Sequence, residues 1–326
     1  MNSYEKFYKN ELVKIEGKIQ NLFKGREPKS LYEPCTYIMS SSGKRLRPFL
    51  VVLGSLAVGG KARDVYNAAV SVEVLHNFTL VHDDIMDNAN MRRGLETLHI
   101  KYDVSTAILA GDNLIALAYL NLLKDCKGNS ENVLKSFTQG IIEICEGQSY
   151  DKEFENRKSV SINEYLLMIQ KKTAALAEMC CSIGGQIAGG TNYQIKQLQS
   201  YGRNLGMAFQ LQDDLLDITA DQTEFGKSIG GDLVEGKKTY LFLKALEKSK
   251  GKIKKDFLSV IKNKGCGKDE IPKFKKYYEE LGILEDTNKE VIKYTNKAIK
   301  AINFIEDDEI KNLFIWLANA LINRIK

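Results

Sequence analysis

Residues 70–87 read VSVEVLHNFTLVHDDIMD, a nearly continuous apolar run that ends in a cluster of aspartates. The apolar side chains fall on most sides of a helix, which predicts a central, buried helix over 64–88. A second stretch, FQLQDDLLD at 209–217, ends in the same DDxxD pattern. In each string the first and last aspartates are four residues apart. A helix therefore presents them on one face, one turn apart.

The paired aspartate strings predict a metal site. Aspartates concentrated in this way repel one another and weaken a helix, so a purely structural role is poorly motivated. Mg²⁺ prefers carboxylate oxygens and commonly bridges one or two of them to a substrate phosphate. Two facing clusters would clamp a phosphate-bearing ligand. The candidate metal ligands are Asp83, Asp84, Asp87, Asp213, Asp214 and Asp217.

The composition predicts an all-α protein. The 326 residues could hold two domains, but the chain has no Ser/Gly/Pro-rich linker and no proline between Pro48 and Pro272. We therefore expect one domain over 1–326. No period-2 strand is evident, and 88–94 is expected to be a polar loop. Helices are expected over 3–23, 64–88, 103–125, 131–150, 161–190, 193–220 and 238–248.

Several features favour a soluble, cytoplasmic protein. The six cysteines form no CxxC pair, which favours reduced thiols, with Cys180 and Cys181 on a buried helix. The amino terminus has no apolar signal core. Asp112 and Asn113 interrupt the most apolar run, 107–123, which predicts a buried helix and no transmembrane segment. The net charge of +5 comes largely from lysines over 248–300, read as solvated helical faces with no nucleic-acid partner.

Basic residues flank both aspartate strings. Arginine's planar fork suits phosphate oxygens and lysine supplies a point charge, so these groups predict a diphosphate held by Mg²⁺ on one side and by cations on another. The alternative is that they only neutralise the aspartates. The flanking residues are Lys44, Arg45, Arg47, Arg92 and Arg93 for the first string, and Lys227, Lys237 and Lys238 for the second.

Three further positions are candidates because of their surroundings. His76 lies two helical turns before Asp83 on the same face, where an anionic ligand or a backbone group could be its partner. Lys172, followed by Thr173, lies in an apolar segment and needs a partner that a diphosphate could supply. Gln210 precedes Asp213 by three residues and is nearly aligned with it.

The chain resembles the trans-type isoprenyl diphosphate synthases (polyprenyl synthases), and among them the geranylgeranyl diphosphate synthases of archaea. The matching strings occur in the family's order between residue 43 and about residue 240. They are GKRLRP at 43–48, EVLHNFTLVHDDIMD at 73–87, RRG at 92–94, GD at 111–112, KTA at 172–174, FQLQDDLLD at 209–217 and GK at 226–227.

The resemblance implies a single helical bundle of the isoprenoid synthase type, with a central cavity between long antiparallel helices. It implies that Asp83, Asp87 and Asp213 hold two or three Mg²⁺ ions, supported by Asp84, Asp214 and Asp217. The allylic diphosphate would be contacted by Arg92, Lys172, Lys227 and Lys237. The diphosphate of isopentenyl diphosphate would be held by Lys44, Arg47, His76 and Arg93. Thr173 and Gln210 would present oxygens to the allylic cation.

The implied reaction is head-to-tail condensation of isopentenyl diphosphate with an allylic diphosphate after Mg²⁺-assisted ionisation, in a homodimer. Phe78, with Leu75 and the small Thr79 beside it, resembles the chain-length floor of enzymes with a twenty-carbon product, which predicts geranylgeranyl diphosphate. Farnesyl or longer products are alternatives. A class I terpene cyclase and a non-catalytic subunit are more remote, because the second string has three aspartates and both strings are intact.

Overall fold

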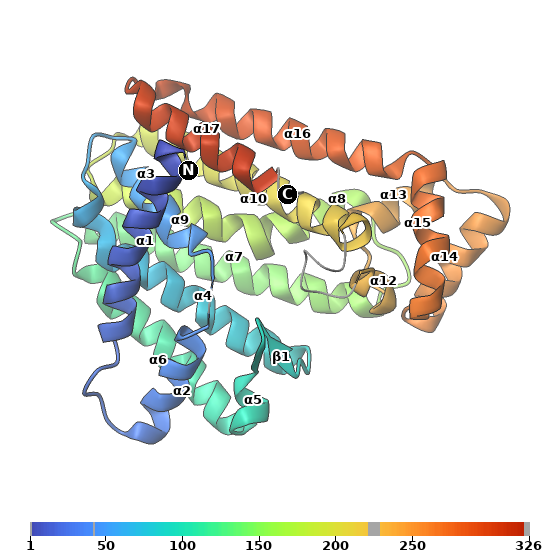
Figure 1. Cartoon of the computed structure of the whole chain (residues 1–326), viewed down its shortest axis with the longest axis horizontal. Coiled ribbons are helices and arrows are strands. Elements are labelled where there is room, and N and C mark those ends of the chain that lie inside the picture. Colours follow the sequence, from blue (N-terminus) through green and yellow to red (C-terminus); the bar gives the residue numbers. More distant parts are fainter. Residues whose placement is uncertain (1, 42, 221–228, 323–326) are drawn as a thin grey trace. The chain divides into compact units, whose positions relative to one another are not determined.

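The structure is a computed structural model that describes residues 2–41, 43–220 and 229–322 (Figure 1). These residues are almost entirely helical, as the composition predicted. The α-helices are α1 (Ser3–Asn21), α2 (Lys29–Met39), α3 (Leu46–Leu56), α4 (Tyr66–Met86), α5 (Leu98–Lys101), α6 (Val104–Leu123), α7 (Ser130–Asn156), α8 (Ile162–Ile169), α9 (Ala175–Ile187), α10 (Asn192–Thr219), α12 (Gly231–Val234), α13 (Tyr240–Lys248), α14 (Gly251–Asn263), α15 (Ile271–Glu280), α16 (Ile283–Ala301) and α17 (Asp308–Ile322). Short 3₁₀ turns are η1 (Ala62–Val65), η3 (Lys268–Glu270) and η4 (Ile302–Phe304).

The chain contacts divide the protein into two compact units, each built from separate stretches of sequence. The first comprises Met1–Thr138, Met179–Gln199 and Phe304–Leu313, and the second comprises Gln139–Glu178, Ser200–Asn303 and Phe314–Lys326. The five boundaries fall inside α7, α9, α10, η4 and α17, so no linker separates the units. The single domain over 1–326 stays a prediction.

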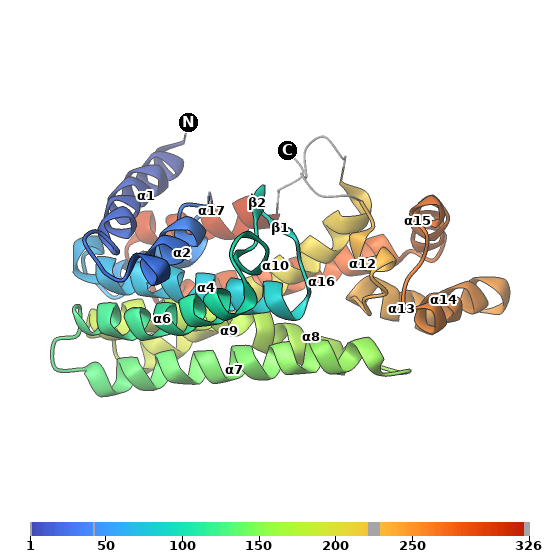
Figure 2. The ribbon, with the colours of Figure 1, turned by 90° about the horizontal axis from the view of Figure 1, so that it is seen from below.

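In the first unit α4 is the central helix, as its sequence predicted. It packs against α3 and α6, and Figure 2 shows α6 running beside it. The backbones of α3 and α9 are in contact at two glycines, Gly54 and Gly184. A Cβ added at Gly54 would lie 2.3 Å from the Cys181 carbonyl oxygen, and one added at Gly184 would lie 2.0 Å from the Val51 carbonyl oxygen. This contact leaves Cys180 and Cys181 fully buried, as expected, and all six cysteines are free.

The polar segment after α4 is a small β-hairpin, so the prediction of no strands was wrong here. Strands β1 (Met91–Arg92) and β2 (Leu95–Glu96) pair antiparallel. The two residues at the turn, Arg93 and Gly94, both have positive φ, at 51° and 78°. Turns of this kind suit the twist of a hairpin. Strands of two residues are too short to show a period-2 pattern, so no pattern in the sequence indicated them.

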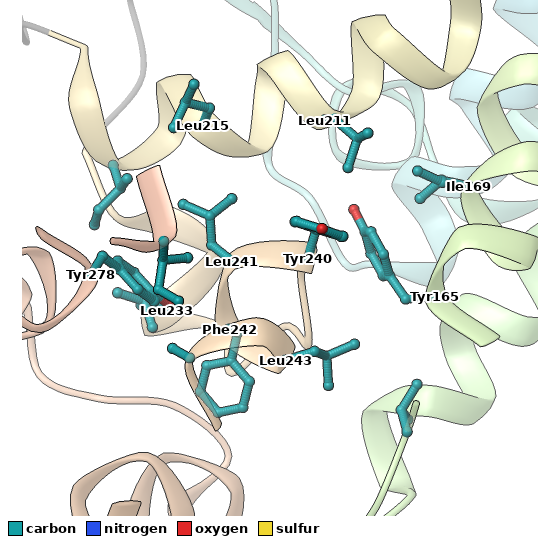
Figure 3. Packing of buried hydrophobic residues seen from close by; sticks show 14 of the residues in the cluster. Tyr165, Ile169, Leu211, Leu215, Leu233, Tyr240, Leu241, Phe242, Leu243 and Tyr278 are labelled. Atoms are coloured by element: carbon teal, nitrogen blue, oxygen red, sulfur yellow. The ribbon is translucent and has the colours of Figure 1, made fainter. Parts of the chain in front are cut away.

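The second unit has its own apolar core. Side chains of α8, α10, α12, α13 and α15 meet in it, including Leu211, Leu215, Leu241 and Tyr278 (Figure 3). Tyr165 of α8 lies in the same layer, and its hydroxyl points toward α10 (Figure 3). The core therefore fixes the helix that carries the second aspartate string against the helix that precedes Lys172.

The helix predicted over 161–190 is interrupted. A π-helical turn, η2 (Gln170–Ala174), separates α8 from α9, and the Ala175 N–H bonds to the Gln170 carbonyl. Such turns insert one residue, widen the helix and often occur at functional sites. Glycines lie where neighbouring helices cross this turn: a Cβ at Gly147 would lie 2.2 Å from the Lys172 nitrogen, and one at Gly206 would lie 2.5 Å from the Ala174 Cα.

Among the described residues, length and composition would allow one helix, α6, to cross a membrane. In the structure, 44% of its most apolar window is buried.

Candidate active site

The first aspartate string lies at the carboxyl end of α4, where Asp87 is the C-cap residue. The partial negative charge of a helix carboxyl end disfavours carboxylates, so this cluster gains from a bound cation. The three side chains differ in environment: Asp83 is half-buried, Asp84 is 1% exposed and Asp87 is exposed. The outer aspartates are therefore the two that a ligand can reach.

Asp84 is held by the hairpin. Arg92 on β1 donates to Asp84 Oδ1 from Nε at 2.7 Å and from Nη2 at 2.6 Å. Burial raises the pKa of the Asp84 carboxyl, against the effect of Arg92. The pair therefore fixes the hairpin to the end of α4. Arg92, predicted to contact the allylic diphosphate, is oriented by Asp84 in this structure.

The loop before α3 is organised by Arg45, for which the sequence indicated only a flanking charge. Arg45 has left-handed backbone angles and a side chain that is almost fully buried. Its Nη1 donates to Glu73 at 2.7 Å and its Nε donates to Glu16 at 2.8 Å, while Nη2 donates to the Met39 and Ser41 carbonyls. The signal for this anchor was Glu73, an acidic residue inside an otherwise apolar helix.

His76 lies among the basic residues of the same unit. It is buried, its Nε2 is 3.4 Å from Arg93 Nη2, and Nδ1 has no hydrogen-bond partner among the described residues. Burial lowers the pKa of His76 well below 6.5, and the charges of Arg47 and Arg93 lower it further. His76 is therefore neutral at pH 7, and the positive charge at this place belongs to the arginines.

Gly43 completes this basic cluster. A Cβ at Gly43 would lie 3.0 Å from Arg93 Nη1, so the loop backbone lies against the guanidinium group. The hydroxyl of Tyr8 bonds to the Lys44 carbonyl and holds the loop from its other side. Arg47 of α3 and Arg93 of the hairpin turn therefore lie near His76 of α4, and the loop before Lys44 lies against Arg93. Their role in binding a diphosphate stays a prediction.

The second aspartate string lies near the carboxyl end of α10 and repeats the pattern of the first. Asp214, the middle aspartate, is buried: the Tyr165 hydroxyl bonds to Oδ2, and Gln210 Nε2 donates to Oδ1 at 3.0 Å. Burial and the charge of Asp232 raise the pKa of Asp214 to about 8. Asp213 and Asp217 are half-buried.

The turn before α12 holds Asp217. The Gly230 N–H donates to the Asp217 carbonyl at 2.7 Å, and the Asp232 N–H donates to Oδ2 at 3.2 Å. Lys237 follows α12 and pairs with Glu235 at 2.7 Å and with Asp232 at 3.7 Å. Although burial works against its charge, these carboxylates raise the pKa of Lys237, which is therefore a permanent cation. Lys227 lies outside the described residues.

The π turn places Lys172 and Thr173 against different helices. Lys172 Nζ forms an ion pair with Asp151 Oδ2 of α7 at 2.5 Å, which is the partner that its position required. The Thr173 hydroxyl donates to Gln210 Oε1 at 3.0 Å. A chain of hydrogen bonds therefore runs from Thr173 through Gln210 to Asp214. Tyr165 belongs to this chain through Asp214, whereas Asp151 contacts Lys172 instead, and neither Tyr165 nor Asp151 was among the sequence candidates.

Phe78, the candidate chain-length floor, contacts His82. The two rings are 4.7 Å apart and tilted by 61°. The His82 ring in turn lies over Gly111 of α6, where a Cβ would be 2.3 Å from Nε2. Leu75 is fully buried, and the Thr79 hydroxyl donates to the His76 carbonyl at 2.8 Å. These contacts brace Phe78, whereas its role as a floor stays a prediction.

No group of three or more His, Cys, Asp or Glu side chains within the described ranges is arranged to hold a metal ion. A Mg²⁺ ion that arrives with a diphosphate needs only one or two protein carboxylates, because phosphate oxygens and waters complete its octahedron. Asp83 and Asp87 in the first unit, and Asp213 and Asp217 in the second, are hard oxygen donors of this kind.

A helical protein with two DDxxD strings, each with a buried middle aspartate and neighbouring cations, fits the class of enzymes that act on diphosphate esters. The sequence profile of the polyprenyl synthetase family matches residues 28–281, and the chain belongs to this family.

Its relatives and structural neighbours carry related names. A geranylgeranyl diphosphate synthase of Sulfolobus acidocaldarius is 46% identical over 82% of this chain and 83% of its own. A geranylfarnesyl diphosphate synthase of Natronomonas pharaonis is 41% identical over 68% of this chain and 70% of its own. The crystal structure of a geranylgeranyl pyrophosphate synthetase from Pyrococcus horikoshii Ot3 superposes with a TM-score of 0.90, at 34% identity over 98% of this chain and 99% of its own.

Proposed function

We propose that this protein is a prenyltransferase that condenses isopentenyl diphosphate head-to-tail with an allylic diphosphate to make geranylgeranyl diphosphate. The observation that carries the proposal is the arrangement shared by the two aspartate strings. In each, the middle aspartate is buried and bonded to neighbouring side chains, while the outer ones are half-buried or exposed. Family membership and the names of the relatives support the same reaction.

The outer aspartates supply the metal site of this proposal. Asp83, Asp87 and Asp213 would hold Mg²⁺, with Asp217 beside them. When bound, Mg²⁺ neutralises the leaving diphosphate as its C–O bond breaks. Asp84 and Asp214 act as supports: Asp84 orients Arg92, and Asp214 fixes the amide of Gln210. Lys172, Lys237 and Arg92 then attract the allylic diphosphate electrostatically.

The amide of Gln210 has a defined orientation. Its nitrogen donates to Asp214, so its oxygen faces Thr173 and accepts the hydroxyl proton. With that proton engaged, the remaining lone pairs of the Thr173 oxygen can face the developing allylic cation. This is electrostatic stabilisation by dipoles that are already in place.

Isopentenyl diphosphate is held by Lys44, Arg47, His76 and Arg93 in this proposal. The neutral His76 can offer a hydrogen bond at Nδ1, and the arginines neutralise the phosphate charge. The double bond of isopentenyl diphosphate attacks the allylic carbon, and one proton then leaves the new chain. By analogy with the family, the departed diphosphate takes this proton.

The product length depends on Phe78. Its ring, braced by His82 above Gly111, would limit the chain at twenty carbons. Thr79 beside it leaves room that a second large aromatic residue would remove.

The proposal includes a cytoplasmic homodimer. Large apolar side chains of α6 are exposed in the single chain, which favours a second copy as their cover. They are Val104 (49%), Ile108 (43%), Leu109 (60%), Leu120 (60%) and Leu123 (41%).

The test is to incubate purified protein with isopentenyl and farnesyl diphosphates, with Mg²⁺ or with EDTA, and to identify products by mass. We expect a twenty-carbon diphosphate that requires both substrates and Mg²⁺. A prenyl product longer than twenty carbons would change only the assigned product length and would leave the proposed reaction standing. A cyclic hydrocarbon formed without isopentenyl diphosphate, or the absence of any product, would refute the proposal in favour of a cyclase or a non-catalytic subunit.

A further inference from the structure

The helix α14 and the loop after it carry a dense group of lysines. Residues 250–268 contain seven lysines and one aspartate, so this segment has a net charge of +6, whereas the whole chain has +5. The one aspartate, Asp256, faces the neighbouring helix α15, where its carboxylate accepts a hydrogen bond from the Tyr277 hydroxyl at 2.9 Å. The exposed side of α14 therefore presents no carboxylate of its own.

One apolar side chain lies among the lysines on this exposed side. Leu258 is 47% exposed. Three exposed lysines surround it at helical spacing, because they lie four and three residues before it and four residues after it. The three are Lys254, Lys255 and Lys262. These three lysines together with Leu258 are called the lysine face below.

The opposite side of α14 is already used by the protein. Phe257 and Val260 are buried, and the Phe257 ring lies 5.2 Å from the ring of Phe274 on α15 (Figure 1). The helix therefore cannot lay its apolar side into a membrane, as isolated amphipathic helices do. A partner of α14 must contact the lysine face.

The lysines of this face form no ion pair with any residue that the structure describes. Other lysines of the same unit do form such pairs. Lys248 pairs with Asp286 at 2.6 Å. Lys293 pairs with Glu290 at 2.9 Å. The positive charge of the lysine face is therefore available to an external anion.

We propose that the lysine face docks on an anionic lipid bilayer, with its lysines against the phosphate headgroups and Leu258 at the boundary of the acyl chains. Charge complementarity supports the headgroup contact, since each basic residue near an anionic bilayer strengthens binding about fivefold. The exposed Leu258 favours a bilayer over a nucleic acid, because a bilayer has an apolar layer beneath its charged surface and a phosphate backbone has none.

The proposed reaction supplies a reason for such a surface. A diphosphate with a twenty-carbon chain partitions into bilayers, because burial of each CH₂ group among the acyl chains is favourable. A docked enzyme releases that product beside the bilayer. This reason depends on the proposed function, whereas the charge and exposure of the lysine face do not.

Co-sedimentation of the full chain with lipid vesicles tests the proposal. The protein should bind vesicles of equal parts phosphatidylglycerol and phosphatidylcholine at about 0.1 M salt. Binding should be lost at about 1 M salt, where charges act over only about 3 Å, and vesicles of phosphatidylcholine alone should not bind. Absence of binding to the anionic vesicles at the lower salt would make the lysine face an ordinary solvated surface and overturn the proposal.

Variants locate the surface on α14. The double variant Lys255→Gln/Lys262→Gln should weaken binding to anionic vesicles about twentyfold to thirtyfold, and Leu258→Ser should weaken it about threefold to tenfold. The matched control, Lys135→Gln/Lys293→Gln, removes the same net charge from two lysines of other helices that already have carboxylate partners. It should change binding by no more than about twofold. All of these variants should keep the melting temperature of the original protein and its kcat without vesicles.

Three results would overturn the docking surface. They are equal weakening by the two double variants, unchanged binding of Leu258→Ser, and binding to a DNA duplex as tight as binding to the anionic vesicles, which would indicate a general polyanion surface. Inactivity of the enzyme toward isopentenyl and farnesyl diphosphates would instead refute the proposed function and leave the docking surface standing.

Discussion

The π turn at 170–174 gives a sharp test, because two glycines of α10 provide a matched pair. An alanine Cβ at 206 would lie 2.5 Å from the Ala174 Cα, within the π turn. An alanine Cβ at 202 would lie 2.5 Å from the Ala177 carbonyl oxygen, in the regular helix α9. Both distances are too short, so each substitution must push a neighbouring backbone away, and only Gly206→Ala pushes the turn that carries Lys172 and Thr173.

The two substitutions should cost similar stability. Overpacking costs roughly 1–3 kcal/mol, and replacing a helical glycine by alanine returns about 1 kcal/mol. The net loss is roughly 0–2 kcal/mol, which lowers the melting temperature by no more than about 8 °C. Both variants should therefore fold at 25 °C.

Their activities should differ. A displacement of about 1 Å at reacting groups can cost up to about a hundredfold in rate. Gly206→Ala should therefore lower kcat about tenfold or more, with an unchanged KM for isopentenyl diphosphate, while Gly202→Ala stays within about twofold of the original rate. Steady-state kinetics and thermal unfolding of the two proteins decide the matter. Equal kcat losses in both, or full activity in Gly206→Ala, would show that the π turn does not position the catalytic groups.

Three further outcomes follow from the described contacts. Tyr165→Phe leaves Asp214 Oδ2 without its donor, so it should cost about 1–3 kcal/mol in urea unfolding and lower kcat through Gln210; unchanged values would show that this network is dispensable. Phe78→Ala should lengthen the prenyl product on chromatography, and an unchanged product would remove the floor. Because the pKa of His76 lies well below 6.5 in the folded protein, the unfolded chain binds more protons just below pH 6.5, and stability falls as the solution is acidified. His76→Asn has no imidazole to protonate, so its free energy of unfolding should fall less between pH 7.5 and pH 5.5. An equal fall in the variant and the original protein would show that His76 does not have the lowered pKa.

The sequence predicted what depends on local pattern. The apolar run before Asp83 predicts α4 because its burial follows from side chains within a few turns. The repeated aspartates predict a cation site because adjacent carboxylates repel one another on a helix. The interruption at Gln170–Ala174 was missed, because a single inserted residue barely disturbs the apolar period. The two-residue strands of the hairpin were missed for a similar reason.

Long-range partners were the other gap. Tyr165 and Asp214 are 49 residues apart in the sequence. Lys172 and its partner Asp151, which lies on α7, are 21 residues apart. Nothing in the local composition of either residue indicates these pairs. Arg45 was visible as a charge, but its role as an anchor depends on Glu73 and Glu16 meeting at one buried point. The sequence therefore identified the charged candidates, and the fold showed how several of them are held.

In the proposed mechanism, the outer aspartates of both strings hold Mg²⁺ on one allylic diphosphate. A crystal structure with Mg²⁺ and a non-hydrolysable allylic diphosphate analogue tests it most directly. We expect carboxylate oxygens of Asp83, Asp87 and Asp213 at about 2.0–2.1 Å from metal ions that also contact the diphosphate. Metal ions bound by only one of the strings, or a diphosphate bound without metal, would contradict it.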